Sequence, residues 1–191
     1  MIKIGILSSY NGSGFIAIND ACKSGYLNAS VEVVISNNTK ANVLKTAEKM
    51  GIKSYCINSK FYPEDNIDLK ILDIFKQNGC DYIFLSGYMK KVDKCLIEFY
   101  HNKIINSHPA LLPNFGGKGM YGRFVHEAVI RQKATKTGVT IHFVNEQYDD
   151  GEYILQKEIE VLPNETVNSI ETKVKALEPS VIVEAFKKLL K

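Results

Sequence analysis

An asparagine and a histidine are separated by one residue in the segment NSHPALLP, which begins at Asn106. Side chains alternate along an extended strand, so Asn106 and His108 should point to the same side. Pro109 restricts His108 to the extended region and ends the strand, which puts the pair at its carboxyl end. Open α/β sheets bind ligands at that edge. The pair is therefore a candidate catalytic site, although a turn with a hydrogen-bonded histidine would use the same residues.

A carboxylate completes this set at Asp149, in the run HFVNEQYDDGEYILQ. An amide N–H can donate to a developing oxyanion, and imidazole has an ordinary pKa suited to moving protons near neutral pH. A neighbouring carboxylate favours the charged form of the imidazole. When an amine attacks a carbonyl carbon, the tetrahedral intermediate carries an oxyanion and a cationic nitrogen. The amide could stabilise the oxyanion, and the imidazole with its carboxylate could take the proton from the nitrogen.

Alternating apolar runs and helical stretches must position these residues. Strands are expected at 2–8, 31–36, 82–86 and 103–106, and helices at 14–24, 40–50, 66–78 and 93–100. A hairpin is expected from 138–145 and 153–161, and a last amphipathic helix from near Thr166 almost to Lys191. Gly79 should stop the third helix, and 164–166 offers capping groups for the last one. This alternation of strands and helices predicts an α/β fold: a Rossmann-like, mainly parallel sheet with helices on both faces, a C-terminal antiparallel hairpin and a closing helix.

The chain of 191 residues suits one domain, 1–191, with a substantial core. A net charge of +3, with scattered lysines, is too mild for a nucleic-acid surface and favours an anionic small molecule as partner. No run approaches a membrane span and the start carries no cleavage site, so we expect a cytoplasmic protein. We also expect a monomer or homodimer, which the sequence does not decide between.

Four cysteines occur, at Cys22, Cys56, Cys80 and Cys95. None forms a C-x-x-C pair, which argues against a zinc site and against a disulfide framework. We expect reduced, mostly buried cysteines and no bound metal.

The first expected strand leads into a glycine-rich segment, SSYNGSGF, at 8–15. Free N–H groups and the helix dipole make such a helix start an anion site. The G-x-G-x-x-A pattern from Gly12 imitates a dinucleotide fingerprint, but the second strand ends in Ser-Asn-Asn at 36–38 instead of the required acid. A single phosphate held by Gly12, Ser13 and Gly14 fits better; a tight turn without a ligand is the alternative.

A second glycine-rich segment, GGKGMYGR, occupies 116–123 in the long irregular stretch 108–122. No Ser or Thr follows Lys118, so the phosphate and magnesium geometry of a P-loop fails and we exclude ATP binding here. A mobile flap beside the site and a flexible turn are equally compatible with this segment.

Taken together, several segments resemble the folate-dependent formyltransferases. NSHPALLP is followed by GVTIHFV and YDDG, ending at Gly151, and the likeness extends to ILSSYNGSGF, to LSGYMKKV at 85–92 and to KVKALE at 173–178. The resemblance is strongest to the members that act in purine (IMP) biosynthesis. It implies transfer of a formyl group from the co-substrate N10-formyltetrahydrofolate to the amine of 5-phosphoribosylglycinamide (glycinamide ribonucleotide), without metal.

The resemblance also implies roles for particular residues. Asn106 would stabilise the oxyanion, His108 would shuttle the proton and Asp149 would hold the imidazole, while Asp150 is a variable, solvated neighbour. The ribonucleotide would meet Gly12, Ser13, Gly14 and Glu178, the last at the ribose hydroxyls; relatives commonly carry Asn at the position of Gly14. The folate pocket would consist of Tyr88, Met89, Lys90, Val92, Val144 and Asn106, with Lys90 and Lys91 near the glutamate tail. None of the other histidines is in an equivalent setting: His142 is expected on a strand, and His101 and His126 in solvent or packed on helices.

Two alternatives remain open. Another folate-dependent formyltransferase, acting on a sugar nucleotide, methionyl-tRNA or water, could use the same Asn, His and Asp. A protein of a different class, a non-catalytic nucleotide-binding module, could bind phosphate at Gly12 and use Asn106 structurally. In such a module ligand binding would survive the loss of His108, and no turnover would be found.

Overall fold

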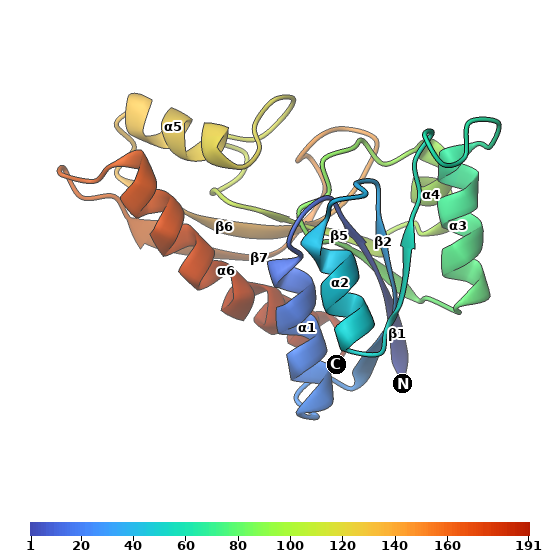
Figure 1. Ribbon diagram of the computed structural model, residues 1–191. Coiled ribbons are helices and arrows are strands. Elements are labelled where there is room, and N and C mark those ends of the chain that lie inside the picture. The colour runs from blue at the N-terminus through green and yellow to red at the C-terminus, as the bar shows by residue number, and fades with distance from the viewer.

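A computed structural model describes residues 1–191, and a single mixed sheet runs through it (Figure 1). Its seven strands lie in the order β3-β2-β1-β4-β5-β6-β7. The first five strands along the chain pair in parallel, and β6 and β7 are antiparallel. The strands are β1 Ile2–Ser8, β2 Ala29–Ser36, β3 Lys53–Cys56, β4 Tyr82–Leu85, β5 Ile104–His108, β6 Lys136–Phe143 and β7 Tyr153–Glu160. The Rossmann-like α/β fold class expected from the sequence is confirmed.

Six helices accompany the sheet: α1 Ser13–Lys23, α2 Asn42–Lys49, α3 Ile67–Gln77, α4 Lys94–Phe99, α5 Arg123–Arg131 and α6 Val167–Leu189. Every element expected from the sequence is present, with its ends within about two residues of the prediction. Two elements, β3 and α5, were not expected. β3 is a four-residue edge strand of alternating exposed and half-buried residues, and α5 starts after Gly122, which provides no side-chain cap.

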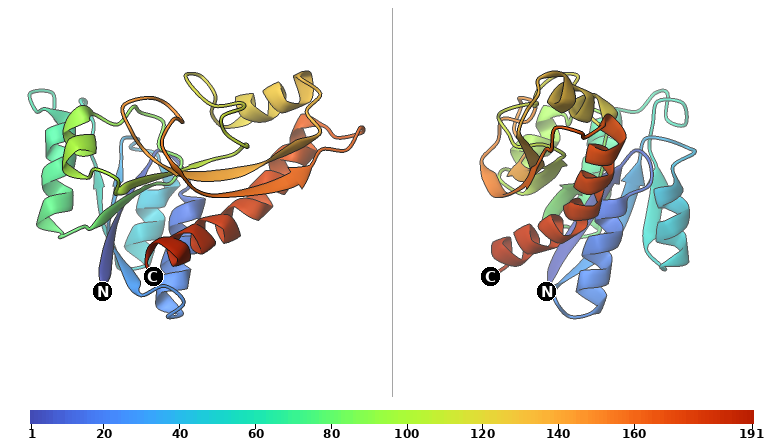
Figure 2. Two further views of the ribbon diagram at one scale, coloured as in Figure 1. Left: turned by 180° about the vertical axis from the view of Figure 1, so that it is seen from behind. Right: turned by 90° about the vertical axis from the view of Figure 1, so that its left-hand side faces the viewer.

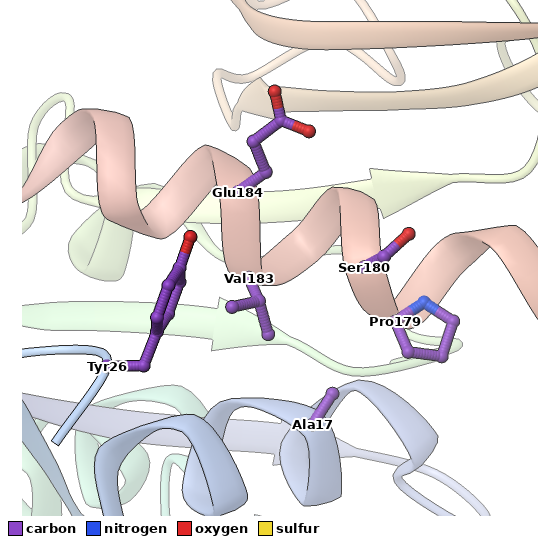
Figure 3. Close-up of a pocket in the computed structure, with 6 residues that line it drawn as sticks. All are labelled: Ala17, Tyr26, Pro179, Ser180, Val183 and Glu184. Atoms are coloured by element: carbon purple, nitrogen blue, oxygen red, sulfur yellow. The ribbon is translucent and has the colours of Figure 1, made fainter. Parts of the chain in front are cut away.

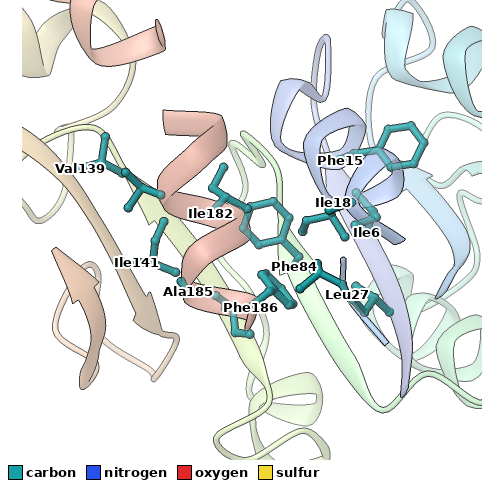
Figure 4. Packing of buried hydrophobic residues seen from close by; sticks show 14 of the residues in the cluster. Ile6, Phe15, Ile18, Leu27, Phe84, Val139, Ile141, Ile182, Ala185 and Phe186 are labelled. Atoms are coloured by element: carbon teal, nitrogen blue, oxygen red, sulfur yellow. The ribbon is translucent and has the colours of Figure 1, made fainter. Parts of the chain in front are cut away.

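Helices cover both faces of the sheet (Figures 1 and 2). α1, α2 and α6 pack on one face, and α3 and α4 on the other. The larger core lies under α1 and α6, where Phe84 of β4 meets Phe186 edge to face with ring centroids 5.5 Å apart (Figure 4). Ile182 of α6 and Ile141 of β6 belong to the same core, which ties the antiparallel hairpin to the parallel part of the sheet.

The helix ends follow the capping signals in the sequence. Thr166 accepts from the backbone N–H of Ser169 and starts α6 with a capping box, and Gly79 lies at positive φ just after α3. The apolar face of α6 packs on the larger core, and its middle turns reach the carboxyl edge of the sheet, where Glu178 meets Ser107. The strand order reverses between β1 and β4, and this topological switch point is where open α/β sheets bind ligands.

The cysteines only partly match expectation. All four are free, but Cys80 alone is buried while Cys22, Cys56 and Cys95 are half-buried, so the expectation of mostly buried cysteines was wrong. Cys56 belongs to the edge strand β3, which has no neighbour on one side. No helix has the length and apolarity needed to span a membrane.

Candidate active site

A cavity of about 750 Å³ opens at the carboxyl ends of β1, β4 and β5. Every residue that the sequence suggested for catalysis or binding lines it: Gly12, Ser13, Gly14, Tyr88, Met89, Lys90, Val92, Asn106, His108, Val144, Asp149 and Glu178. These residues come from five separate segments of the chain. The structure thus brings the predicted site together in one place, while the role of each residue remains a prediction.

Asn106 and His108 lie on the same face of β5, as the alternation of a strand predicts. In the antiparallel register with β6, Asn106 is opposite His142 and His108 is opposite Thr140. His108 is buried, with 3% of its surface exposed, and Asn106 is half-buried. Both side chains line the cavity from the strand end that Pro109 terminates.

The ring of His108 lies between two hydrogen-bond acceptors. Its Nε2 is 2.8 Å from the carbonyl oxygen of Phe115, and its Nδ1 is 3.5 Å from Oδ2 of Asp149. A carbonyl only accepts, so its partner assigns the ring proton to Nε2, and Nδ1 is the atom that can take up and release a proton. Burial lowers the pKa of His108, while the charge of Asp149 and the Phe115 carbonyl act in the opposite direction.

Asp149 is held in place by a backbone hydrogen bond and by its own turn conformation. It lies in the β6–β7 connection at φ 55°, in the left-handed region, with 11% of its side chain exposed. Its Oδ2 accepts from the N–H of Gly117 at 2.9 Å, so the glycine-rich segment is anchored to the catalytic candidate. Asp150 is exposed and accepts from Asn145, which agrees with the expectation of a solvated turn residue.

His142 lies on a strand and His126 on a helix, as expected, but both also line the cavity, which the sequence did not predict. His142 is 2% exposed and lines the cavity, with Nε2 3.2 Å from Nδ2 of Asn106 and 3.7 Å from Oδ1 of Asp149. His126, on α5, is also buried against the cavity. His101 is exposed, as expected. Detecting His142 from the sequence would have required the register of β5 against β6, which no local pattern supplies.

The helix start after β1 has the backbone geometry of an anion site. Gly12 adopts φ 68° as the N-cap of α1 and provides no side-chain cap. The Phe15 N–H donates to Ser86 Oγ at 3.0 Å, so the N–H groups of Ser13 and Gly14 are the ones left at the helix start for an anion. Gly14 faces the core: a Cβ there would be 2.8 Å from Phe84 and 3.0 Å from Ile182. A side chain at position 14 would therefore require these two neighbours to shift.

Glu178 reaches the cavity from the middle of α6. Its Oε1 accepts from Ser107 Oγ at 2.5 Å, which links α6 to β5 beside Asn106. Burial raises the pKa of Glu178, and the Ser107 hydrogen bond acts in the opposite direction. One carboxylate oxygen is thus committed to Ser107, and the other is available for a hydroxyl-bearing ligand.

The opposite wall of the cavity follows β4. Val92 is buried and Tyr88 half-buried, and burial raises the pKa of the Tyr88 phenol to about 12, so it is a neutral donor at physiological pH. Met89 is 41% exposed at the rim. The ammonium of Lys91 lies 5.9 Å from the ring of Tyr148, across the mouth from β4 to the β6–β7 turn.

The glycine-rich segment 116–122 forms part of the cavity wall. Gly117, Gly119 and Gly122 have positive φ, and an added Cβ would find open space at each. At its start the chain contacts both site residues: the Phe115 carbonyl lies against His108, and the Gly117 N–H donates to Asp149. From there the segment continues into α5. Whether it moves as a flap remains a prediction.

A separate hollow lies between α1 and α6 (Figure 3). Ala17, Val183 and Tyr26 face this gap, and the Glu184 carboxylate points away from it. It offers no set of groups for proton transfer or nucleophilic attack. No three His, Cys, Asp or Glu side chains are arranged to hold a metal ion anywhere in residues 1–191.

The fold agrees with the comparisons to known proteins. A family model described as formyl transferase matches residues 2–186, and the chain belongs to the formyl transferase family. Similar relatives within it are phosphoribosylglycinamide formyltransferases. That of Bacillus subtilis is 33% identical over 95% of this chain and 93% of its own length. The chloroplastic one of Arabidopsis thaliana is 35% identical over 95% of this chain, which spans 63% of that relative's length. The structure of glycinamide ribonucleotide transformylase 1 from Geobacillus kaustophilus superposes with a TM-score of 0.91, at 31% identity over 100% of both chains.

Proposed function

We propose that this chain transfers a formyl group from N10-formyltetrahydrofolate to the amine of glycinamide ribonucleotide, as a single formyltransferase domain of residues 1–191. The observation that carries the proposal is the convergence of Asn106, His108 and Asp149 on one cavity, in a chain similar to phosphoribosylglycinamide formyltransferases. The cavity also has a helix N-terminus for a phosphate and, at Glu178, a carboxylate for ribose hydroxyls.

The transfer is direct in this proposal. The amine nitrogen attacks the formyl carbon, a carbon–nitrogen bond forms, and the carbonyl oxygen becomes an oxyanion. Asn106 donates an N–H to that oxygen, an interaction that strengthens as the charge develops. The bond to the folate nitrogen then breaks, and the carbonyl re-forms on the glycinamide.

His108, supported by Asp149, transfers the proton from the attacking amine to the leaving folate nitrogen. Nδ1 of His108 accepts it from the attacking amine, since Nε2 already donates to Phe115. Asp149 Oδ2, 3.5 Å away, stabilises the imidazolium. The same proton passes to the folate nitrogen as it leaves, so neither an oxidant nor a covalent enzyme intermediate is needed.

Turnover with defined substrates tests the proposal. The protein, glycinamide ribonucleotide and N10-formyltetrahydrofolate are mixed, and loss of the formyl group from folate is followed by absorbance. Formylated ribonucleotide is the expected product. An amino-sugar nucleotide and water alone are offered in parallel; faster deformylation with either would favour that formyltransferase instead. Ligand binding without any turnover would support a non-catalytic nucleotide-binding module.

Replacing Glu178 by Gln is expected to raise the KM for the ribonucleotide about tenfold, with a smaller change in the KM for folate, because the charged acceptor for the ribose is lost. Glu184→Gln on the same helix is the control, since its carboxylate points away from α1 and pairs with Lys157 outside the cavity. If only the folate KM rises, the two ligands are assigned to the wrong ends of the cavity.

Activity with N10-formyltetrahydrofolate is expected to persist in excess chelator, and formate plus ATP should give no product. The formyl group arrives already activated on folate, and its developing charge is met by Asn106, His108 and Asp149. Making formyl phosphate from formate would instead require nucleotide and magnesium. Loss of activity in chelator that one divalent metal restores would contradict this expectation.

A further inference from the structure

The tautomer of His142 is fixed by the strand that carries it. Nδ1 of His142 lies 2.8 Å from the carbonyl oxygen of Phe143. Because a carbonyl only accepts, the partner assigns the ring proton to Nδ1. The neutral ring then presents the lone pair of Nε2 to Nδ2 of Asn106, 3.2 Å away.

This contact determines which way the Asn106 amide faces. An amide carries a donor and an acceptor of similar shape, and only its partners distinguish the two orientations. An accepting Nε2 on His142 requires the NH₂ of Asn106 on that side. One N–H is used there, and the second remains for a ligand in the cavity. With the amide turned over, Oδ1 would take the place of the NH₂ donor and could not stabilise an oxyanion.

We propose that His142 is a positioning residue: its neutral, Nδ1-protonated ring holds the Asn106 amide in the orientation that donates to the transition-state oxyanion. The inference deepens the proposed formyl transfer and rests on it. His142 touches neither reacting group in this scheme and acts only through Asn106.

The positioning role depends on His142 being neutral. Two groups face it: Asp149, with Oδ1 3.7 Å from Nε2, and His108 on the neighbouring strand. Burial lowers the pKa of His142, and a positively charged His108 lowers it further. The hydrogen bond to the Phe143 carbonyl and the charge of Asp149 raise it. A protonated Nε2 would donate, so the Asn106 amide would have to turn. The arrangement is therefore complete above the pKa of His142 and is lost as the pH falls through it.

Two substitutions separate the acceptor from the bulk of the side chain. His142→Leu removes the acceptor and should lower kcat about ten- to hundredfold, below the full effect of losing an oxyanion donor, with little change in either KM. His142→Gln can accept through Oε1 and should restore most of kcat. In an Asn106→Ala background His142→Leu should cost nothing further, because a residue that acts only through Asn106 has no other route to the rate.

The pH dependence gives a readout that packing alone would not change. Wild-type kcat should fall on the acid side more steeply than one protonation allows, because both His108 and His142 must be neutral. In His142→Gln the acid limb should become a single protonation. Nitrogen–proton correlation NMR of the free protein should find His142 protonated on Nδ1 at neutral pH, a measurement that needs no activity and no variant.

The outcomes separate this inference from the proposed function. Absence of turnover by the wild type would overturn formyl transfer, while the NMR tautomer would still report on His142. With wild-type turnover present, an Nε2-protonated His142, equal losses of kcat in His142→Leu and His142→Gln, or additive losses with Asn106→Ala would each overturn the positioning role. If His142→Leu does not fold, the NMR spectrum and the His142→Gln pH profile decide.

Discussion

Alanine at Asn106 or at His108 is expected to lower kcat by at least about two orders of magnitude, with each KM changed much less. In the proposed mechanism both residues act on charge that exists only in the transition state, so their loss should appear in kcat. Asn106→Ala removes the oxyanion donor, and His108→Ala removes the atom, Nδ1, that carries the proton between the two nitrogens.

The control for these variants is His101→Ala, which removes an exposed imidazole just before β5. It should retain wild-type kinetics. Thermal unfolding should show all three variants folded, because Asn106 and His108 stand at the cavity and not in either apolar core. Near wild-type kcat in a folded His108→Ala protein would contradict the proton-transfer scheme.

The parts of this site that follow local rules could be predicted from the sequence. Asn106 and His108 share a face because side chains alternate on any strand, and Pro109 ends that strand wherever the sheet lies. The helix start at Gly12 is similarly local, since a glycine at positive φ before a helix needs no distant partner. The same holds for the parallel sheet, which follows from buried apolar runs alternating with helices.

The parts that depend on distant pairing could not be predicted. His142 faces Asn106 only because of the antiparallel register between β5 and β6, and a shift of one residue would turn it to the other side of the sheet. Ser107 meets Glu178 only because α6 crosses the carboxyl end of β5. In both cases the residue types were ordinary, and long-range packing gave them partners.

The backbone contacts to the catalytic candidates have no sequence signal at all. Phe115 accepts from His108 through its carbonyl, and Gly117 donates to Asp149 through its N–H. Every residue has the first group and every residue but proline the second, so the fold alone selects them. The glycines of 116–123 suggested flexibility, whereas Phe115 and Gly117, around the start of that stretch, are held by hydrogen bonds to the two catalytic candidates.

Replacing Asp149 by Asn should lower kcat about ten- to a hundredfold and move the acid limb of the pH profile to lower pH. The carboxylate opposes the effect of burial on His108, so its removal lowers the pKa of His108 further. The imidazole then stays neutral to lower pH, which shifts the limb. The imidazolium formed during transfer also loses its stabilising charge, which lowers the plateau.

The substitution isolates charge from shape. Asparagine tolerates the left-handed conformation of position 149 and keeps a carbonyl oxygen for the Gly117 N–H, so the glycine-rich segment should stay anchored. Asp149 also lies near His142, so part of the pH shift could come from His142. Combining Asp149→Asn with His142→Gln removes that contribution, and the shift of the acid limb that remains belongs to His108. Asp150→Asn removes an exposed carboxylate one residue away and should change neither kcat nor the profile. If the acid limb is unchanged in Asp149→Asn but shifts in Asp150→Asn, the proposed role passes to Asp150. The acid limb shifts only when the removed carboxylate is the one that interacts with the imidazole, and that carboxylate is the one that can stabilise the imidazolium.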